Sequence, residues 1–403
     1  MITTRTLGEM LLRRYVTDFI TETQQLSSPV HSRLRESNNF VPTGDGAYFA
    51  IRISGNESGG GWRAKDDQQL PVPSNEAIKQ ARVDVKKFYH TVSISGLAEA
   101  VSMRGGEDAF ASGLTDAINL AVVRAGAIFE ETFLRGDGTG RITNVSAAVT
   151  GATTITVDDA RTIRTGTNVV FLDNTTGLRA DGPVQVLSVD VPQSTITVSS
   201  PVTLSGGEGV YRAGEQSEAA PPEEVTALGL PALVNDKGMI YNVSRTTFPI
   251  LQSKVIDAGG NSLDEAMLRR LRRRLMIETA VSSLDDFVMI SNHEQFDRYT
   301  EIALPFRRFN DLTLELGARQ DMTSFEGRPW LVTWAAIPDE VYFLNLAAIE
   351  RGVVRPLSID EKVNMAWIPG QDAYLVLLKT YFENVGRYLN QSGKITNLSK
   401  PTY

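Results

Sequence analysis

The sequence predicts an α+β protein that carries a small all-β insertion. Three observations lead to this class. The stretch from Gly105 to Arg135 has helical periodicity, residues 146–215 are rich in threonine, valine and glycine, and the rest mixes helix-like with strand-like segments. A chain of 403 residues is too long for one ordinary domain, and 42% hydrophobic and 22% charged residues are typical of a globular protein.

The residues that usually build catalytic or metal sites are scarce or badly spaced. The chain has no cysteine, which excludes disulfides and thiolate metal sites. Its three histidines, His31, His90 and His293, lie far apart in the sequence, so no zinc site is expected. The turn from Gly136 to Gly140 follows a helix and precedes a strand, the reverse of the order found in phosphate-binding loops. We therefore expect no catalytic residue, cofactor or metal, and a protein that is not an enzyme.

Charge and hydropathy limit the partners. A net charge of −8 gives no basic excess for gripping phosphates, so any contact with DNA should be loose and nonspecific. Apolar runs fall short of the ~18 residues that a membrane span needs, so no membrane contact is expected. Arg13 and Arg14 interrupt the first apolar residues, unlike the apolar core of a secretory signal, which predicts synthesis in the cytoplasm.

The first hundred residues predict an arm followed by a long hairpin. A short amphipathic helix is expected over residues 5–20, and the polar stretch to Gly46 reads as an extended arm. Strands are expected at Ala47–Ser54 and Arg82–Ser95, the second with a bulge at Lys86-Lys87 where its alternation changes phase. About 27 residues connect them, a length that is uncommon in a compact domain and points to a functional flap.

The helix that follows should end at Arg135, with Gly136 as its left-handed stop. Its expected apolar stripe consists of Phe110, Leu114, Ala117, Ile118, Ala121, Ala125, Ile128 and Thr132.

Residues 146–215 contain five short strand patterns separated by glycine or proline turns, which favours a small barrel or sandwich. The strands are expected at Thr153–Val157, Asn168–Leu172, Val184–Val191, Thr195–Ser199 and Val210–Arg212. The side chains expected to face inward are Ile155, Val157, Val169, Phe171, Val186, Leu187, Ile196 and Val198.

The remainder is α+β. Ser262 to Glu265 form a capping box ahead of a helix whose expected stripe is Leu263, Met267, Leu271 and Leu275. A short helix is expected around His293–Tyr299. Strands are expected at Phe287–Ser291, Pro329–Trp334, Glu340–Leu344 and Ala373–Phe382.

Two groups of residues are candidates for contacts between subunits. The first lies on the capping-box helix and consists of the five arginines Arg269, Arg270, Arg272, Arg273 and Arg274. They could equally be a solvated face or pair with carboxylates of a neighbouring copy, and contact with DNA is a third alternative. The second comprises Trp62, Arg63 and Lys65 in the glycine-rich tip of the flap. Trp and Arg are typical interface anchors, and a flexible loop gives them no local core.

The order of these elements resembles the major capsid proteins of tailed bacteriophages, which share the Hong Kong 97-like fold. Four local stretches carry the likeness: Glu131–Gly140; Gly229–Val234 with Tyr241–Arg245; Phe325–Pro329 leading to Ile337-Pro338 and Val341–Asn345; and Phe382–Arg387. The resemblance implies a flap that lies over the next subunit, a peripheral domain holding the spine helix, and an axial domain at the capsomer centre. In one branch of the family a flap lysine crosslinks to a neighbour. No partner for Lys65 is identified here, so noncovalent shells are expected.

On this resemblance the chain divides into an N-terminal arm (1–46), an extended flap (47–98), a peripheral domain with the spine helix (99–145), a β-rich insertion (146–215), an axial domain (216–360) and return strands of the peripheral domain (361–403). The implied function is self-assembly into hexamers and pentamers of an icosahedral virion head around double-stranded DNA. The arm begins close to Met1, so scaffolding, like the portal, is expected to be a separate protein, and a decoration protein is possible. The alternatives are an encapsulin-like shell protein, a tail-tube subunit or a soluble hydrolase.

Overall fold

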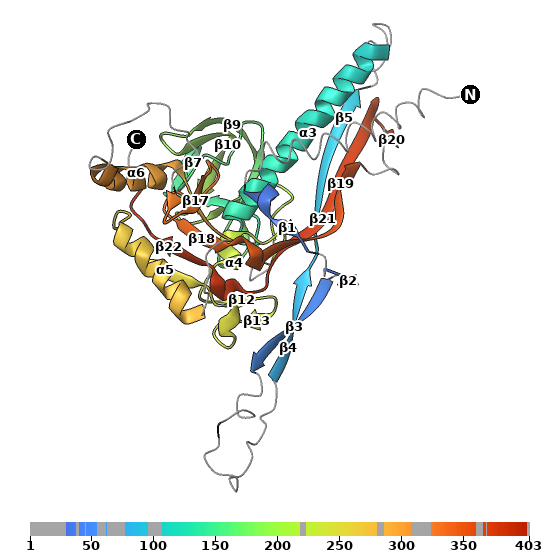
Figure 1. The fold of residues 1–403 in the computed structure, drawn as a ribbon. Coiled ribbons are helices and arrows are strands. Elements are labelled where there is room, and N and C mark those ends of the chain that lie inside the picture. Colours follow the sequence, from blue (N-terminus) through green and yellow to red (C-terminus); the bar gives the residue numbers. More distant parts are fainter. Residues whose placement is uncertain are drawn as a thin grey trace.

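The structure is a computed structural model that describes residues 30–37, 40–44, 46–54, 62, 77–95, 107–217, 223–279, 286–307, 324–359, 366–367 and 369–400. The amphipathic helix expected over residues 5–20 and most of the flap tip lie outside these residues. Figure 1 shows a body from which one long helix with its sheet extends in one direction and a two-stranded hairpin in another.

The long helix α3 (Glu107–Arg135) packs on a five-stranded sheet. The sheet consists of β1 (Arg35–Glu36), β5 (Lys86–Ser95), β19 (Ile349–Ile359), β20 (Ala366–Trp367) and β21 (Ala373–Gly386). β21 lies between β5 and β19, antiparallel to both, while β1 adds to β19 in parallel. The eleven-residue strand β19 was not expected from the sequence.

The apolar stripe of α3 rotates along the helix. Ile118, Ala121, Val122, Ala125 and Phe129 face Val376, Leu378 and Phe382 of β21 in one buried cluster. Phe129 and Phe133 are buried where the sequence predicted Ile128 and Thr132, which are only partly covered. The predicted stripe was therefore wrong in its last turns, because the core lies slightly to one side of the four-residue row. The side chains of Phe110, Leu114 and Ala117 lie outside the described residues.

The hairpin pairs β3 (Gly46–Ser54) with β4 (Ala77–Asp84), and β2 (Pro42–Thr43) adds to β3. Its root is anchored because Ala47, Ile51, Ala81 and Val83 are all buried. The predicted bulge at Lys86-Lys87 was wrong. The chain instead leaves one sheet at Asp84 and enters another at Lys86, since β4 pairs with β3 and β5 pairs with β21.

The end of α3 differs from the expected left-handed stop at Gly136. Positive φ angles occur two and four residues later, at Gly138 (92°) and Gly140 (86°). Gly136 is needed for space, because a Cβ there would lie 2.4 Å from the carbonyl oxygen of Thr132.

Six antiparallel strands follow: β6 (Arg141–Asn144), β7 (Val149–Thr156), β8 (Asn168–Leu172), β9 (Arg179–Asp190), β10 (Thr195–Leu204) and β11 (Gly209–Arg212). Their order is β6-β11-β8-β9-β10-β7, and an antiparallel bridge between Val145 and Val157 joins the two edge strands, so the sheet closes into a barrel. The barrel thus begins at Arg141, before the expected boundary at residue 146, because the unpredicted β6 completes it.

The barrel has a core of its own. Seven of the eight side chains expected to face inward are buried: Ile155, Val157, Val169, Phe171, Val186, Ile196 and Val198. The prediction for Leu187 was wrong, since its side chain is 52% exposed. Neighbouring residues of a strand point to opposite faces, and Val186 already points inward.

The body is built on a second six-stranded sheet, in the order β14 (Lys254–Asp257), β22 (Gly393–Thr396), β18 (Val341–Asn345), β15 (Phe287–Ser291), β17 (Arg328–Val332) and β16 (Ser324–Phe325). Helices α5 (Glu265–Thr279) and α6 (His293–Arg307) pack on one face in a shared apolar cluster. Leu263, Leu271 and Leu275 of the predicted stripe are buried there, whereas Met267 is only partly buried.

The other face of this sheet joins the largest core, together with the end of α3, the hairpin root and short elements after the barrel. These elements are α4 (Leu230–Leu233), β12 (Met239–Ile240), β13 (Val243–Ser244) and the 3-10 helices η1 (His31–Arg33), η3 (Pro249–Leu251), η5 (Leu346–Ala348) and η7 (Leu389–Gln391). The expected boundary at residue 360 does not separate the sheets, because β19 lies beside α3 and β22 returns to the body.

Candidate assembly surfaces

Three of the five arginines on α5 are neutralised within the chain. Arg269 pairs with Glu265 at 2.7 Å, and Arg274 pairs with Glu278 at 2.9 Å. Arg272 pairs with Glu326 in the turn between β16 and β17. These side chains therefore stabilise the helix and its neighbours, and their charges are largely neutralised before a second copy could bind them.

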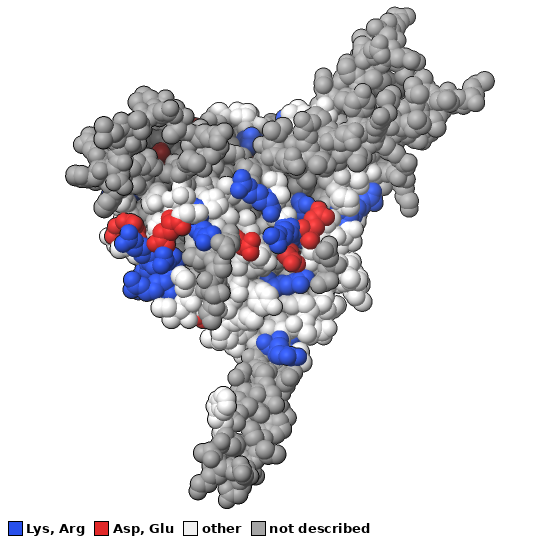
Figure 2. All heavy atoms as spheres, viewed as in Figure 1, with Lys and Arg blue, Asp and Glu red and all other residues white. Residues whose placement is uncertain are grey.

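The remaining two, Arg270 and Arg273, are exposed and form no ion pair within the described part of the chain. They share one stripe of the helix with Ala266 and with Ile277, whose side chain is 73% exposed. Figure 2 shows basic side chains gathered on the surface over α5, at the left of the molecule. An apolar and cationic stripe that is turned away from the body is suited to a contact with another molecule.

The flap residues are described only in part. Trp62 is fully exposed in the single chain, whereas Arg63 and Lys65 lie outside the described residues.

Sequence reasoning missed a third surface, the face of the β5–β21–β19 sheet that points away from α3. Cross-strand pairing sets Lys87 and Arg355 on either side of Tyr381, and Tyr89 opposite Lys379. Residues 86–95, 353–359 and 373–382 contain no Asp or Glu, although the chain is acidic overall. The absence of acidic residues from three separate segments could have indicated a basic surface in the sequence. Only the pairing of the three strands shows that these segments share one face.

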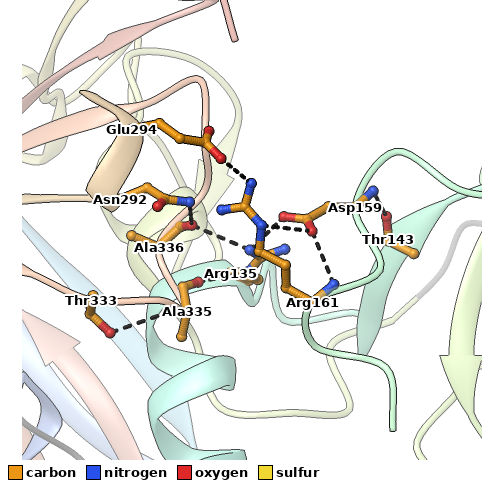
Figure 3. A network of polar contacts seen from close by, with 9 residues as sticks. All are labelled: Arg135, Thr143, Asp159, Arg161, Asn292, Glu294, Thr333, Ala335 and Ala336. Atoms are coloured by element: carbon orange, nitrogen blue, oxygen red, sulfur yellow. Dashed lines mark hydrogen bonds and ion pairs between the residues drawn. The ribbon is translucent and has the colours of Figure 1, made fainter. Parts of the chain in front are cut away.

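The barrel is fixed to the body by a buried ion network at the end of α3 (Figure 3). Arg135 donates to Asp159 at 2.7 Å and to the carbonyl oxygen of Ala335 at 2.7 Å. Arg161 pairs with Glu294 of α6 and lies 3.5 Å from the second oxygen of Asp159. Because the Arg135 and Asp159 side chains are no more than 10% exposed, water competes little for these contacts.

A second joint lies about one turn earlier on the helix, four residues before Arg135. Glu131, which is 4% exposed, pairs with Arg212 at the end of β11 and with Arg164 at 3.4 Å. The guanidinium of Arg164 also lies 5.4 Å from the ring centre of Trp334. Two independent charged contacts therefore hold the barrel in one orientation on α3.

A further buried group binds the arm. The carboxylate of Glu130 on α3 accepts hydrogen bonds from the backbone amides of His31 (2.9 Å) and Val30 (3.3 Å). The His31 ring is packed among Phe129, Phe133 and Phe382, at centroid distances of 6.0, 5.8 and 5.8 Å. Burial raises the pKa of Glu130 to about 7, although the two amides oppose the shift. Burial, with Arg351 nearby, lowers the pKa of His31 to about 3.

Glu383 on β21 is a second buried carboxyl group. One of its oxygens accepts the amides of Leu228 (2.7 Å) and Asn384 (2.9 Å), and its other oxygen has no hydrogen-bond partner. Burial raises the pKa of Glu383 to about 8.

Among the described residues no group of His, Asp or Glu is arranged to hold a metal ion. The described helices include none that is both long enough and apolar enough to cross a membrane.

Comparison with known proteins identifies the fold. No family model matches the sequence, and no curated protein matches it either. Among solved structures, the capsid of cyanophage A-1(L) superimposes with a TM-score of 0.51 at 11% sequence identity, covering 94% of this chain and 93% of that chain. The chain has a phage capsid fold.

Weaker likenesses include the capsid of a native GTA particle (TM-score 0.47, 10% identity, 94% of this chain and 91% of that one). The procapsid of satellite phage P4 that includes a size determination protein gives a TM-score of 0.41 at 13% identity, over 96% and 91% of the two chains. The capsid fold expected from the sequence is confirmed, whereas the division into arm, flap, peripheral, axial and inserted parts stays a prediction.

Proposed function

We propose that the chain is the major capsid protein of a tailed bacteriophage, which assembles as hexamers and pentamers into an icosahedral shell around double-stranded DNA. The observation that carries this proposal is the capsid fold, which extends over 94% of the chain. In this reading the protein is a structural component of the virion, made in the host cytoplasm, and it catalyses nothing.

The surfaces of the single chain support association. The hairpin β3–β4 projects from the body (Figure 1), with Tyr48 47% exposed within its root and Ile78 58% exposed beyond the root. A two-stranded ribbon is marginally stable in water by itself, so a neighbouring surface would stabilise it. Burying a few hundred Å² of apolar surface per contact contributes several kcal/mol, at ~25 cal/mol/Å², before the cost of ordering.

The partners follow from the same proposal. The principal partner is another copy of the chain, and scaffolding and portal proteins would be separate chains. Contact with DNA would be nonspecific, because a chain of net charge −8 has only local basic surface. The barrel would project from the shell and contact a neighbour or a decoration protein.

The test is assembly of the purified chain and of a flap variant. The flap deletion removes residues 55–76 and stops before β4, because β4 begins at Ala77 and Ala81 is fully buried. Ser54 and Ala77 are cross-strand partners, so a two-residue Gly-Gly turn can join them without disturbing the ladder. A matched control replaces residues 55–76 with a Gly/Ser segment of equal length.

Negative-stain images of the unmodified protein should show closed shells, whereas both flap variants should give folded, soluble protein with few shells. A shell count for the deletion variant equal to that of the unmodified protein would remove the flap from the proposal. Tubes, or a monomer at every concentration and with scaffolding protein supplied, would overturn the proposed function itself.

A further inference from the structure

Two carboxyl groups are buried without a cation, and one of them, Glu130, lies directly under the arm. Glu130 is fully buried and Glu383 is 1% exposed, and neither forms an ion pair with a described residue. Elsewhere this chain pairs its buried acids, as Asp159 and Glu131 show. An ionised carboxylate in an apolar site without a cation costs several kcal/mol. Burial therefore disfavours the ionised form of each group, although the two backbone amides that donate to it oppose this effect.

We propose that Glu130 is a latch that holds arm residues Val30–Ser37 on α3 while its carboxyl group is protonated, and that releases the arm as it ionises. The geometry explains why the arm is the part that moves. Glu130 is covered by the backbone of Val30 and His31, which donate directly to it. Undocking this short segment is the smallest change that brings Glu130 into contact with water.

The rest of the arm is held by contacts that water can replace. Ser37 donates its amide to the carbonyl oxygen of Arg351 at 2.9 Å, and Glu36 pairs with Arg351 at 2.6 Å. The Glu36 side chain is 61% exposed, so this ion pair contributes little. Burial of Val30, His31 and Leu34 is thus the main force that keeps the arm docked.

The charged groups that surround the latch do not neutralise it. His31 stays uncharged, since its pKa is about 3, and Arg351 on β19 is engaged by Glu36. Lys86 on β5 is the cation that acts on Glu383, but it is engaged by Glu224. Its Nζ donates to the carbonyl oxygen of Glu224 at 2.8 Å and lies 3.7 Å from the Glu224 carboxylate. Glu224 in turn disfavours ionisation of Glu383.

The direction of the effect follows from the two pKa values. Both lie above the ordinary value of 4.5, at about 7 for Glu130 and about 8 for Glu383. Docking on Glu130 is therefore strongest below pH 4.5, and it weakens until the pH reaches about 7. For Glu130 alone, the docking constant should fall about twentyfold between about pH 5.5 and about pH 7.5.

The experiment is hydrogen exchange of the unassembled full chain at these two pH values, corrected for the intrinsic rate. The readout is the protection of the peptide covering residues 30–37 relative to a barrel peptide covering Asn168–Leu172. The variant is Glu130→Gln, which cannot ionise. The controls are Glu383→Gln, which changes a buried acid that accepts no hydrogen bond from the arm, and Glu36→Gln, which changes an exposed acid of the arm itself.

The relative protection of the arm should fall about twentyfold in the unmodified chain, in Glu383→Gln and in Glu36→Gln. It should fall much less in Glu130→Gln, whatever the absolute protection of that variant. An equal fall in all four proteins, or no fall in the unmodified chain, would overturn the latch. The latch does not depend on shell assembly, so failure of the proposed function would leave this result unchanged.

Discussion

Arg245 shows how a single buried residue organises the body. It is 1% exposed and donates to four carbonyl oxygens, those of Leu233 (3.0 Å), Asn235 (2.8 Å), Leu251 (2.9 Å) and Ala232. Burial lowers the pKa of Arg245 to about 10, which leaves it charged at neutral pH. Its planar fork joins α4, the segment after it and η3, a geometry that lysine cannot reproduce.

Arg245→Met should therefore destabilise the protein by about 3 kcal/mol or more, because four buried carbonyl groups lose their donor. Arg245→Lys should recover only part of this loss. Urea unfolding measures both values, and Arg269→Met serves as a control, since Arg269 makes a single exposed ion pair whose loss should cost under about 1 kcal/mol. A loss for Arg245→Met no greater than for the control would show that water replaces the guanidinium.

At the scale of elements, the arginines of α5 fall into two groups. One group forms ion pairs within the chain, and the other group is available to a partner. Reversing Arg270 and Arg273 to Glu should change the free energy of unfolding by under about 0.5 kcal/mol, because neither is paired within the described chain. Shell formation by this double variant should be lost if α5 meets an acidic surface of another copy.

The matched control reverses Arg269 and Arg274 instead, which sets new carboxylates beside Glu265 and Glu278. Like charges at this helical spacing are unfavourable, so the control should destabilise the monomer more and impair assembly less. Thermal unfolding and negative-stain shell counts provide the two measurements. Normal shells from the Arg270 and Arg273 variant would show that this stripe of α5 faces solvent in the shell and contacts no neighbouring copy.

The barrel is the element most suited to independent folding. Its ring is closed by the Val145–Val157 bridge, and its fourteen-residue buried core comes entirely from residues 145–210. A fragment of residues 141–213 should give a cooperative thermal transition with a β-type circular dichroism spectrum. A fragment from residue 146 should be less stable, because it lacks β6 and therefore leaves β11 with a free edge. If neither fragment unfolds cooperatively, the joint with α3 must supply the missing stability.

At the scale of the whole molecule, the protein combines rigid joints with projecting parts. The Arg135–Asp159–Arg161–Glu294 network fixes the barrel between α3 and α6, so these parts should move together (Figure 3). The hairpin β3–β4 and the long end of α3 project from this unit instead (Figure 1). Such a shape exposes surface that a second copy could cover, which fits the proposed role in a shell.

The sequence by itself determined the elements whose signal is local. Asn168–Leu172 and Phe287–Ser291 are strands with the predicted bounds, and the helix predicted from Gly105 to Arg135 runs from Glu107 to Arg135. Side-chain periodicity over a few residues was enough for these, because it reflects which face of one element is apolar. The capsid fold could also be predicted, because the order of the elements along the chain can be read from the sequence.

Only the tertiary structure decided which segments meet. The switch of the chain from the hairpin to the β21 sheet at Val85 looked like a bulge, because each half alternates normally and only the partner strand changes. The pairing of Arg269, Arg272 and Arg274, but not of Arg270 and Arg273, depends on where carboxylates lie in space, and Glu326 is far along the chain. Glu130 and Glu383 look like ordinary acids in the sequence, and become buried groups with raised pKa values because segments over 90 residues apart close over them. Burial and pairing are set by contacts distant in sequence, which local periodicity does not record.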